Sequence, residues 1–240
     1  MGSIQTRLRL ITVLLYTFAL CLPAKSQRLR DFDVPGALPR GSTVVIGFLG
    51  GYENWNDPHR GVRKVALELR SLNVPGLYVE TIENRHQGLA MKLLERAGVS
   101  SDAHVRVILY GQSWGGAALI RTAQELKKEG VPVALTVQVD SVGLHDAVIP
   151  SNVQAAANLY QHDIIGIEGR TKIRAEDPAA TRILENTRLS YLFRPTSTLN
   201  EADMSWARRV LGGSHAKMEA DSVVWEHVEA LILNSVGGTL

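Results

Sequence analysis

The sequence predicts an α/β protein in which a mostly parallel sheet is flanked by helices on both faces. Between residues 43 and 140, apolar runs of strand length alternate with amphipathic stretches of helical length. Strands that alternate with helices in this way form parallel sheets, because each crossover returns the chain to the same end of the sheet. The chain has 240 residues, of which 45% are hydrophobic and 21% charged, so it is long enough to bury a core without disulfides.

The first predicted strand, 43–49, reads TVVIGFL, a nearly continuous apolar run typical of a strand that is buried on both faces. The next stretch predicts a helix over 56–72, capped by Asn56 or Asp57, because its apolar residues recur on one helical face. The same two patterns predict further strands and helices up to Asp140. They are strands at 77–82, 104–111 and 132–140, and helices at 87–98 and 114–129.

After Asp140 the alternation loosens. The composition there predicts short helices over 149–163 and 176–187, a strand over 188–193 and two last helices over 200–213 and 219–234. We therefore expect a single domain over 27–240, with 141–187 as a lid insertion. Residues 27–42 contain two prolines and little periodicity, so they predict a surface arm.

The first 26 residues have the features of a secretory signal peptide. Arg7 and Arg9 precede an apolar run over 10–22, and Ala24 and Ser26 occupy the small-residue cleavage positions. The run is too short for a typical membrane-spanning helix. We therefore expect export with cleavage near Ser26, which leaves no stable membrane span, and the alternative is an uncleaved N-terminal anchor.

Loss of this segment would change both the thiol content and the charge. Cys21 is the only cysteine, and the mature chain would contain none. Without Arg7, Arg9 and Lys25, the 26 basic residues become 23 against 24 acidic residues, which changes the net charge from +2 to −1. A chain with this balance has no electrostatic footprint for nucleic acid, so we expect no nucleic-acid partner.

The segment GQSWG, residues 111–115, fits the pattern G-x-S-x-G. An apolar strand precedes it and an amphipathic helix follows it, which is the context that a nucleophile elbow requires. In that context Ser113 would project its hydroxyl beyond the carboxyl end of the sheet. The alternative is an ordinary glycine-rich turn in which Ser113 caps the helix.

On the segment LYGQSWGGAA and the surrounding order of strands and helices, the chain resembles the α/β-hydrolase superfamily. Its Ser-Trp-Gly-Gly form is similar to that of esterases, lipases and proline-iminopeptidase-like members. The resemblance covers about 43–140, and too few residues precede 43 for the usual first two strands, so it implies a minimal α/β-hydrolase fold.

This resemblance implies a serine hydrolase that cleaves a carboxylic ester, with lipids and thioesters included, and that needs no cofactor and no metal. The partner would be a small-molecule or lipid ester substrate. Two alternatives stay open. One is a peptidase or acyltransferase with the same triad, and the other is a non-catalytic binding protein on a hydrolase scaffold.

The resemblance also implies an oxyanion hole made of two backbone N–H groups. One belongs to Trp114, and the other to Phe48 or Leu49 in the segment GFLGGYENW. The alternative for this segment is that Gly50 and Gly51 only form a sharp turn.

In the superfamily the order of the triad is Ser, acid, His. His215, in the segment LGGSHAKMEAD before the last predicted helix, is the implied general base, unless it is an ordinary loop histidine. Asp140 ends the strand after the nucleophile strand and is the candidate acid, unless it is only a cap or turn residue. The other candidates for the acid are Asp163, Asp177 and Asp203.

Overall fold

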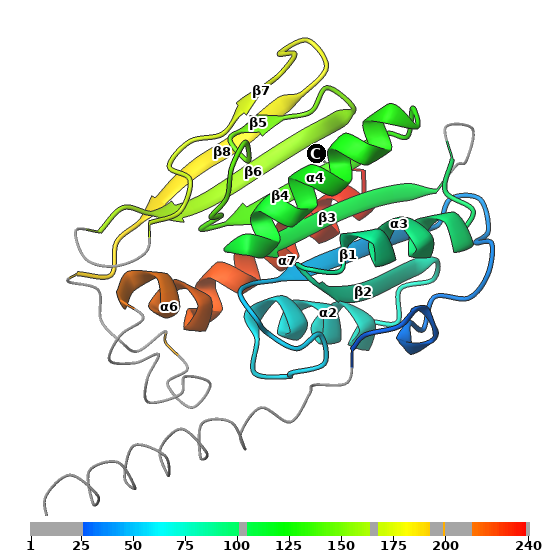
Figure 1. The fold of residues 1–240 in the computed structure, drawn as a ribbon, viewed down its shortest axis with the longest axis horizontal. Helices are drawn as coiled ribbons and strands as arrows, with labels where there is room; N and C mark the ends of the chain where they lie inside the picture. Colours follow the sequence, from blue (N-terminus) through cyan, green and yellow to red (C-terminus); the bar gives the residue numbers. More distant parts are fainter. Residues whose placement is uncertain (1–25, 101–104, 164–167, 193–198, 200–212, 239–240) are drawn as a thin grey trace, which may run out of the picture.

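The main sheet confirms the predicted fold class. The computed structural model describes residues 26–100, 105–163, 168–192, 199 and 213–238. Within these residues, the main sheet has six parallel strands in the order β2-β1-β3-β4-β6-β8 (Figure 1). The strands are β1 (Thr43–Leu49), β2 (Leu77–Glu83), β3 (Arg106–Gln112), β4 (Val133–Val139), β6 (Val153–Gln161) and β8 (Arg182–Leu189).

Helices cover both faces of this sheet. One face carries α3 and α4, and the other carries α2 and α7 (Figure 1). The helices are α2 (Gly61–Ser71), α3 (Gln87–Arg96), α4 (Trp114–Lys128), α6 (Gly213–Ala220) and α7 (Ser222–Val236). The remaining elements are the short helix η1 (Leu29–Asp31) and the two-stranded sheet of β5 (Val148–Ile149) and β7 (Arg174–Ala175).

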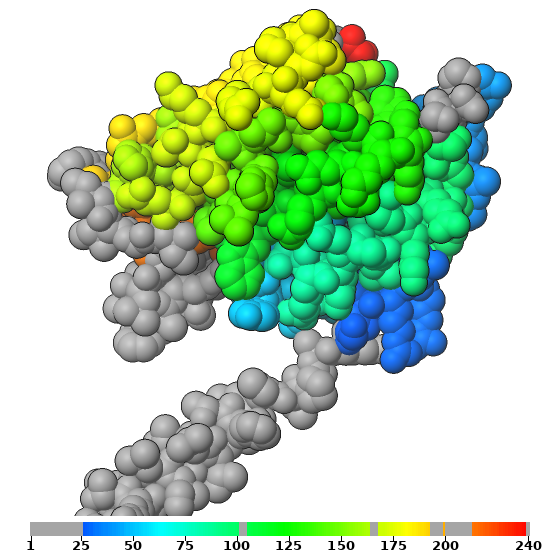
Figure 2. Space-filling view, turned by 45° about the horizontal axis from the view of Figure 1, so that its top comes forward, coloured from blue at the N-terminus to red at the C-terminus, as the bar shows by residue number. Residues whose placement is uncertain are grey.

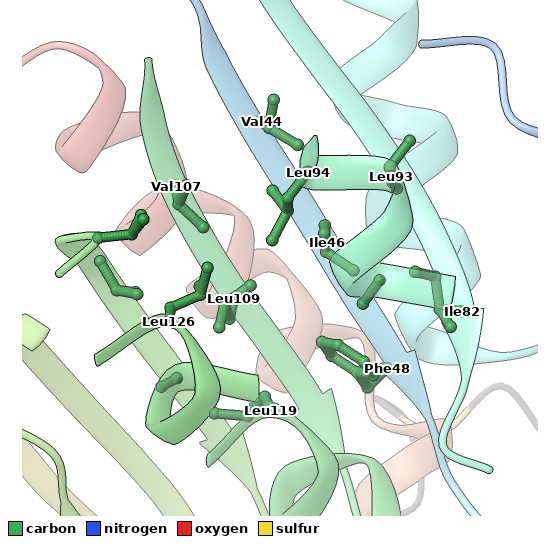
Figure 3. Close-up of a cluster of buried hydrophobic side chains, with 14 of the residues drawn as sticks. Val44, Ile46, Phe48, Ile82, Leu93, Leu94, Val107, Leu109, Leu119 and Leu126 are labelled. Carbon is green, nitrogen blue, oxygen red and sulfur yellow. The ribbon is translucent and has the colours of Figure 1, made fainter. Parts of the chain in front are cut away.

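The core consists of two layers, one on each face, because successive side chains of a strand point to opposite faces. On β1, Val44, Ile46 and Phe48 pack toward α3 and α4 (Figure 3), whereas Val45 and Leu49 pack toward α2 and α7. These five side chains are fully buried. The continuous apolar run of this strand follows from its central place in the sheet, where both faces are covered.

The helices predicted over 149–163 and 176–187 were wrong. The first stretch contains β6, which pairs with β4 and β8, and the second contains the first part of β8. These strands belong to the main sheet, so they are not parts of a lid. In the space-filling view the yellow-green and yellow surface of this region continues directly into the green surface of α4 (Figure 2).

The first helix begins later than predicted, at Gly61 with Arg60 as its N-cap. Residues 56–60 form turns, in which the Asp57 carboxylate accepts hydrogen bonds from the His59 N–H and from Nε of Arg60. The aspartate therefore stabilises the turn before the helix and does not cap the helix itself. Residues 200–212 of the helix predicted over 200–213, and the segment 1–25, lie outside the described residues, whereas Gly213 is the first residue of α6.

The arm at residues 27–42 is tied to the sheet more closely than its composition predicts. Phe32 and Val34 are buried in the core layer below α3. Oε1 of the buried Glu80 accepts the N–H groups of Asp33 and Val34, and its Oε2 lies 2.6 Å from Nη2 of Arg70. Burial raises the pKa of the Glu80 carboxyl, although Arg70 and the two N–H groups act in the opposite direction.

Candidate active site

Ser113 lies between β3 and α4, where the sequence predicts a nucleophile elbow. Its φ is 54° and its ψ is −124°, so its backbone adopts a conformation that non-glycine residues rarely take. Such strain persists only where the surrounding structure holds it, and here the chain turns sharply from a buried strand into a helix. A Cβ on Gly115 would overlap the carbonyl oxygen of Phe48, so only glycine permits this close approach of the elbow to the end of β1.

His215 reaches Ser113 from a helix and not from the loop that the sequence predicts. It is the third residue of α6, and its Nε2 lies 3.0 Å from Oγ of Ser113. The side chain is 12% exposed, which leaves the ring largely shielded from water. The glycines of the segment LGGSHAKMEAD predict a loop, but Gly213 starts the helix with a φ of 54°.

Asp140 extends the hydrogen-bonded chain that links Ser113 to His215. Its Oδ2 lies 2.6 Å from Nδ1 of His215, and the residue is fully buried at the end of β4. The carboxylate also accepts hydrogen bonds from the Gly169 N–H at 3.0 Å and from Nε2 of Gln161 at 3.0 Å. A buried carboxylate with donors on both oxygens is held in one orientation, so it fixes which nitrogen of the imidazole faces Ser113.

The other predicted acids lie elsewhere. Asp163 is buried but accepts hydrogen bonds from Ser190, from the Tyr191 N–H and from Ser214, so it reaches the neighbour of His215 and not the ring. Asp177 is exposed and binds the Ala179 N–H in the turn before β8. Asp203 lies outside the described residues.

The predicted oxyanion donors flank the elbow. Trp114 is the first residue of α4, and the first N–H groups of a helix have no acceptor within that helix. Phe48 and Leu49 are the last two residues of β1. The N–H of the next residue, Gly50, donates to Oε2 of Glu53 at 3.1 Å, so Glu53 organises the loop that follows β1.

Two aromatic side chains are exposed next to Ser113. Tyr52 is 80% exposed and Trp114 is 41% exposed, and their rings meet edge to face with centroids 5.5 Å apart. Large apolar side chains at such exposure, beside a reactive group, form a surface suited to an apolar ligand.

Three residues that shape the site were not predicted from the sequence. Gln112 approaches His215, and Gln161 and Gly169 hold the Asp140 carboxylate. Gln161 ends β6, and a correct prediction of this strand would have placed its side chain at the edge where Asp140 emerges. No signal in the sequence marks Gly169, because its contribution is a backbone N–H brought in by the loop after β6.

The part of the chain that the structure describes holds no group of three or more His, Cys, Asp or Glu residues arranged for a metal ion. In that same part, no helix combines the length and apolar character needed to cross a bilayer.

Comparisons with known proteins give matches among solved structures alone. No family model and no curated protein matches the chain. Among solved structures, it is similar to a novel cutinase-like protein from Cryptococcus sp., with a TM-score of 0.46 and 14% identity over 86% of this chain and 100% of that chain. A likeness at this level carries no argument about function, so the candidate function depends on the geometry of the site.

Proposed function

We propose that the protein is an exported serine hydrolase that cleaves a carboxylic ester through a Ser113-His215-Asp140 triad on a minimal α/β-hydrolase fold. The observation that carries the proposal is a chain of two hydrogen-bonded contacts. Ser113 Oγ lies 3.0 Å from His215 Nε2, and His215 Nδ1 lies 2.6 Å from Asp140 Oδ2. This is the arrangement that activates a serine hydroxyl for attack on a carbonyl carbon.

In the proposed mechanism, Oγ of Ser113 attacks the ester carbonyl while Nε2 of His215 takes the hydroxyl proton. Asp140 keeps the Nδ1–H of the ring in place and stabilises the imidazolium that forms. The tetrahedral oxyanion accepts hydrogen bonds from the Trp114 N–H and from an N–H of Phe48 or Leu49. The leaving alcohol takes the proton from His215, and water then hydrolyses the acyl-enzyme by the same steps in reverse order.

The exposed aromatic pair favours an ester with an apolar acyl or alcohol group. Tyr52 and Trp114 present their rings beside the elbow, where a substrate bound to Ser113 would contact them. The signal-like features of residues 1–26 support export.

Labelling with a fluorophosphonate probe tests the nucleophile. We expect the purified mature protein to be labelled, Ser113→Ala to abolish labelling, and the exposed Ser71→Ala to label like the wild type. Failure of the wild type to label, or labelling that survives Ser113→Ala, would remove the hydrolase assignment.

A panel of p-nitrophenyl esters with increasing acyl length then tests the substrate class. The substitution Trp114→Ala removes the ring but keeps the backbone N–H, so we expect kcat/KM to fall more for long acyl chains than for acetate. The exposed Leu72→Ala, distant in sequence from the elbow and matched as an exposed apolar residue, should leave the chain-length profile unchanged. An equal profile in Trp114→Ala would place the apolar group of the substrate elsewhere.

A further inference from the structure

Gln112, the residue before the proposed nucleophile, places its carboxamide against the ring nitrogen that faces Ser113. Nε2 of Gln112 lies 3.2 Å from Nε2 of His215, and Gln112 is 2% exposed. We propose that Gln112 is a positioning residue that competes with Ser113 for this nitrogen and thereby sets how readily His215 accepts a proton. The inference depends on the proposed hydrolase function only for its kinetic consequences.

The surroundings of the carboxamide show that its place is built into the fold. A Cβ on Gly50 would overlap Oε1 of Gln112, so the amide occupies the space that the missing side chain leaves. The same Cβ would lie 3.2 Å from Cβ of Ser113. Gln112 is therefore enclosed between the loop after β1 and the imidazole, and it cannot turn to solvent.

Hydrogen-bond chemistry then defines the competition. The neutral ring donates its Nδ1–H to Asp140, so Nε2 offers a single lone pair. The Ser113 hydroxyl and the Gln112 amide are both donors within reach of that lone pair, at 3.0 and 3.2 Å. A donor that binds the lone pair stabilises the neutral ring, so this contact opposes protonation of Nε2.

Protonation of His215 changes the contact with Gln112. When the O–H bond of Ser113 breaks and an N–H bond forms at Nε2 of His215, that nitrogen becomes a donor. The NH₂ group of Gln112 then faces another donor, so its hydrogen bond to the ring is lost when the ring is charged. No proton passes to Gln112 at any point, so it acts only through His215.

Apart from Asp140, the charged side chains near the His215 ring bind other partners. Among the described residues, the ring nitrogens of His215 contact Asp140, Ser113 and Gln112. On α6 itself, Glu219 lies one turn further and pairs with Arg60 of the β1–α2 connection at 3.5 Å, and the Lys217 ammonium is directed to the carbonyl of Tyr191. Asp163, at the end of β6, binds the Ser214 hydroxyl.

The dependence of kcat/KM on pH tests the proposal. Gln112→Leu removes the donor at similar size, and we expect the midpoint of the acid limb to rise by about half to one pH unit. Gln112→Glu places a carboxylate beside the ring and should raise the midpoint further, by about one to two pH units. Gln138→Leu, a buried glutamine on β4 that binds the Asp146 carbonyl, is the matched control and should keep the wild-type midpoint.

A second measurement does not depend on turnover. In a Ser113→Ala background, the ¹⁵N resonance of His215 Nε2 is titrated with and without Gln112→Leu, or Gln112→Met if the leucine variant does not fold. We expect the midpoint to move upward, in the same direction as the kinetic one. Unchanged midpoints in the Gln112 variants would overturn the inference, whereas a wild type that neither labels nor hydrolyses esters would overturn only the proposed function.

Discussion

Asp140 is the residue whose environment most restricts its chemistry. Its backbone has a φ of 43°, its side chain is fully buried, and its two oxygens accept hydrogen bonds from His215, Gln161 and Gly169. A carboxylate held in this way can orient one tautomer of the imidazole and balance the charge of the imidazolium.

We therefore expect Asp140→Asn to lower kcat on a p-nitrophenyl ester by about 10⁴-fold, because the amide would favour the wrong tautomer of His215. The circular dichroism spectrum should stay native. Asp177→Asn, at an exposed turn, should keep near-normal turnover. If Asp140→Asn turned over normally, the role of the acid would pass to another carboxylate.

Gly169 also restricts the position of the Asp140 carboxylate. A Cβ on this glycine would overlap Oδ1 of Asp140. Gly169→Ala should displace the carboxylate and lower kcat by about 10²-fold, since a shift of about 1 Å in a catalytic group has an effect of this size. Gly36→Ala, where a Cβ would meet nothing within 4 Å, should leave kcat unchanged, and normal turnover of Gly169→Ala would show that the loop adapts.

The start of helix α6 is fixed by Asp163. The carboxylate at the end of β6 binds Ser214, the residue before His215, and also Ser190 and the Tyr191 N–H. Burial acts to raise the pKa of the Asp163 carboxyl, but these hydrogen bonds and the charge of Arg188 lower it below its usual value.

The sign of this shift predicts how stability depends on pH. Because the folded pKa of Asp163 is depressed, its contribution to the free energy of unfolding is complete above the unfolded value of about 3.9 and is lost as the pH falls through the folded value. Asp163→Asn should reduce the free energy of unfolding at pH 7 by about 2 kcal/mol and flatten its decline below pH 4. Urea titrations at several pH values measure both, and an equally steep decline in the variant would assign the acid sensitivity to other carboxyl groups.

Elements were predictable where apolar periodicity was strong and unpredictable where small residues replaced it. The strands and helices from Thr43 to Val139, and α7, follow from their patterns. β6 reads VQAAANLYQ, and its three alanines favour a helix, but their small side chains suit a strand buried between β4 and β8. Ser113, Asp140 and His215 could be predicted because each belongs to a recognisable local context, whereas Gln161 depended on the missed strand and Gly169 on tertiary approach.

We expect the stability of the fold and the activity of the site to depend on different parts of the molecule. Phe32 packs into the core layer at the β2 end of the sheet, whereas α6, which carries His215, packs against β6. Phe32→Ala should cost about 3 kcal/mol of stability and lower Tm by about 10 °C, with kcat unchanged at 25 °C.

Phe32→Leu, which keeps most of the buried area, should recover most of that loss in differential scanning calorimetry. A fall of kcat in Phe32→Ala at a temperature where the variant is fully folded would show that the arm and the site are coupled.

The pairing of α2 with α7 has a consequence for how the chain is made. Side chains of these two helices share one core layer, although α2 begins at Gly61 and α7 ends at Val236. All pairings in the main sheet are parallel, and parallel pairing is slow to form because each contact closes a long stretch of chain. This layer cannot close until α7 has left the ribosome, so α2 waits for its packing partner while the strands and helices between them are being made.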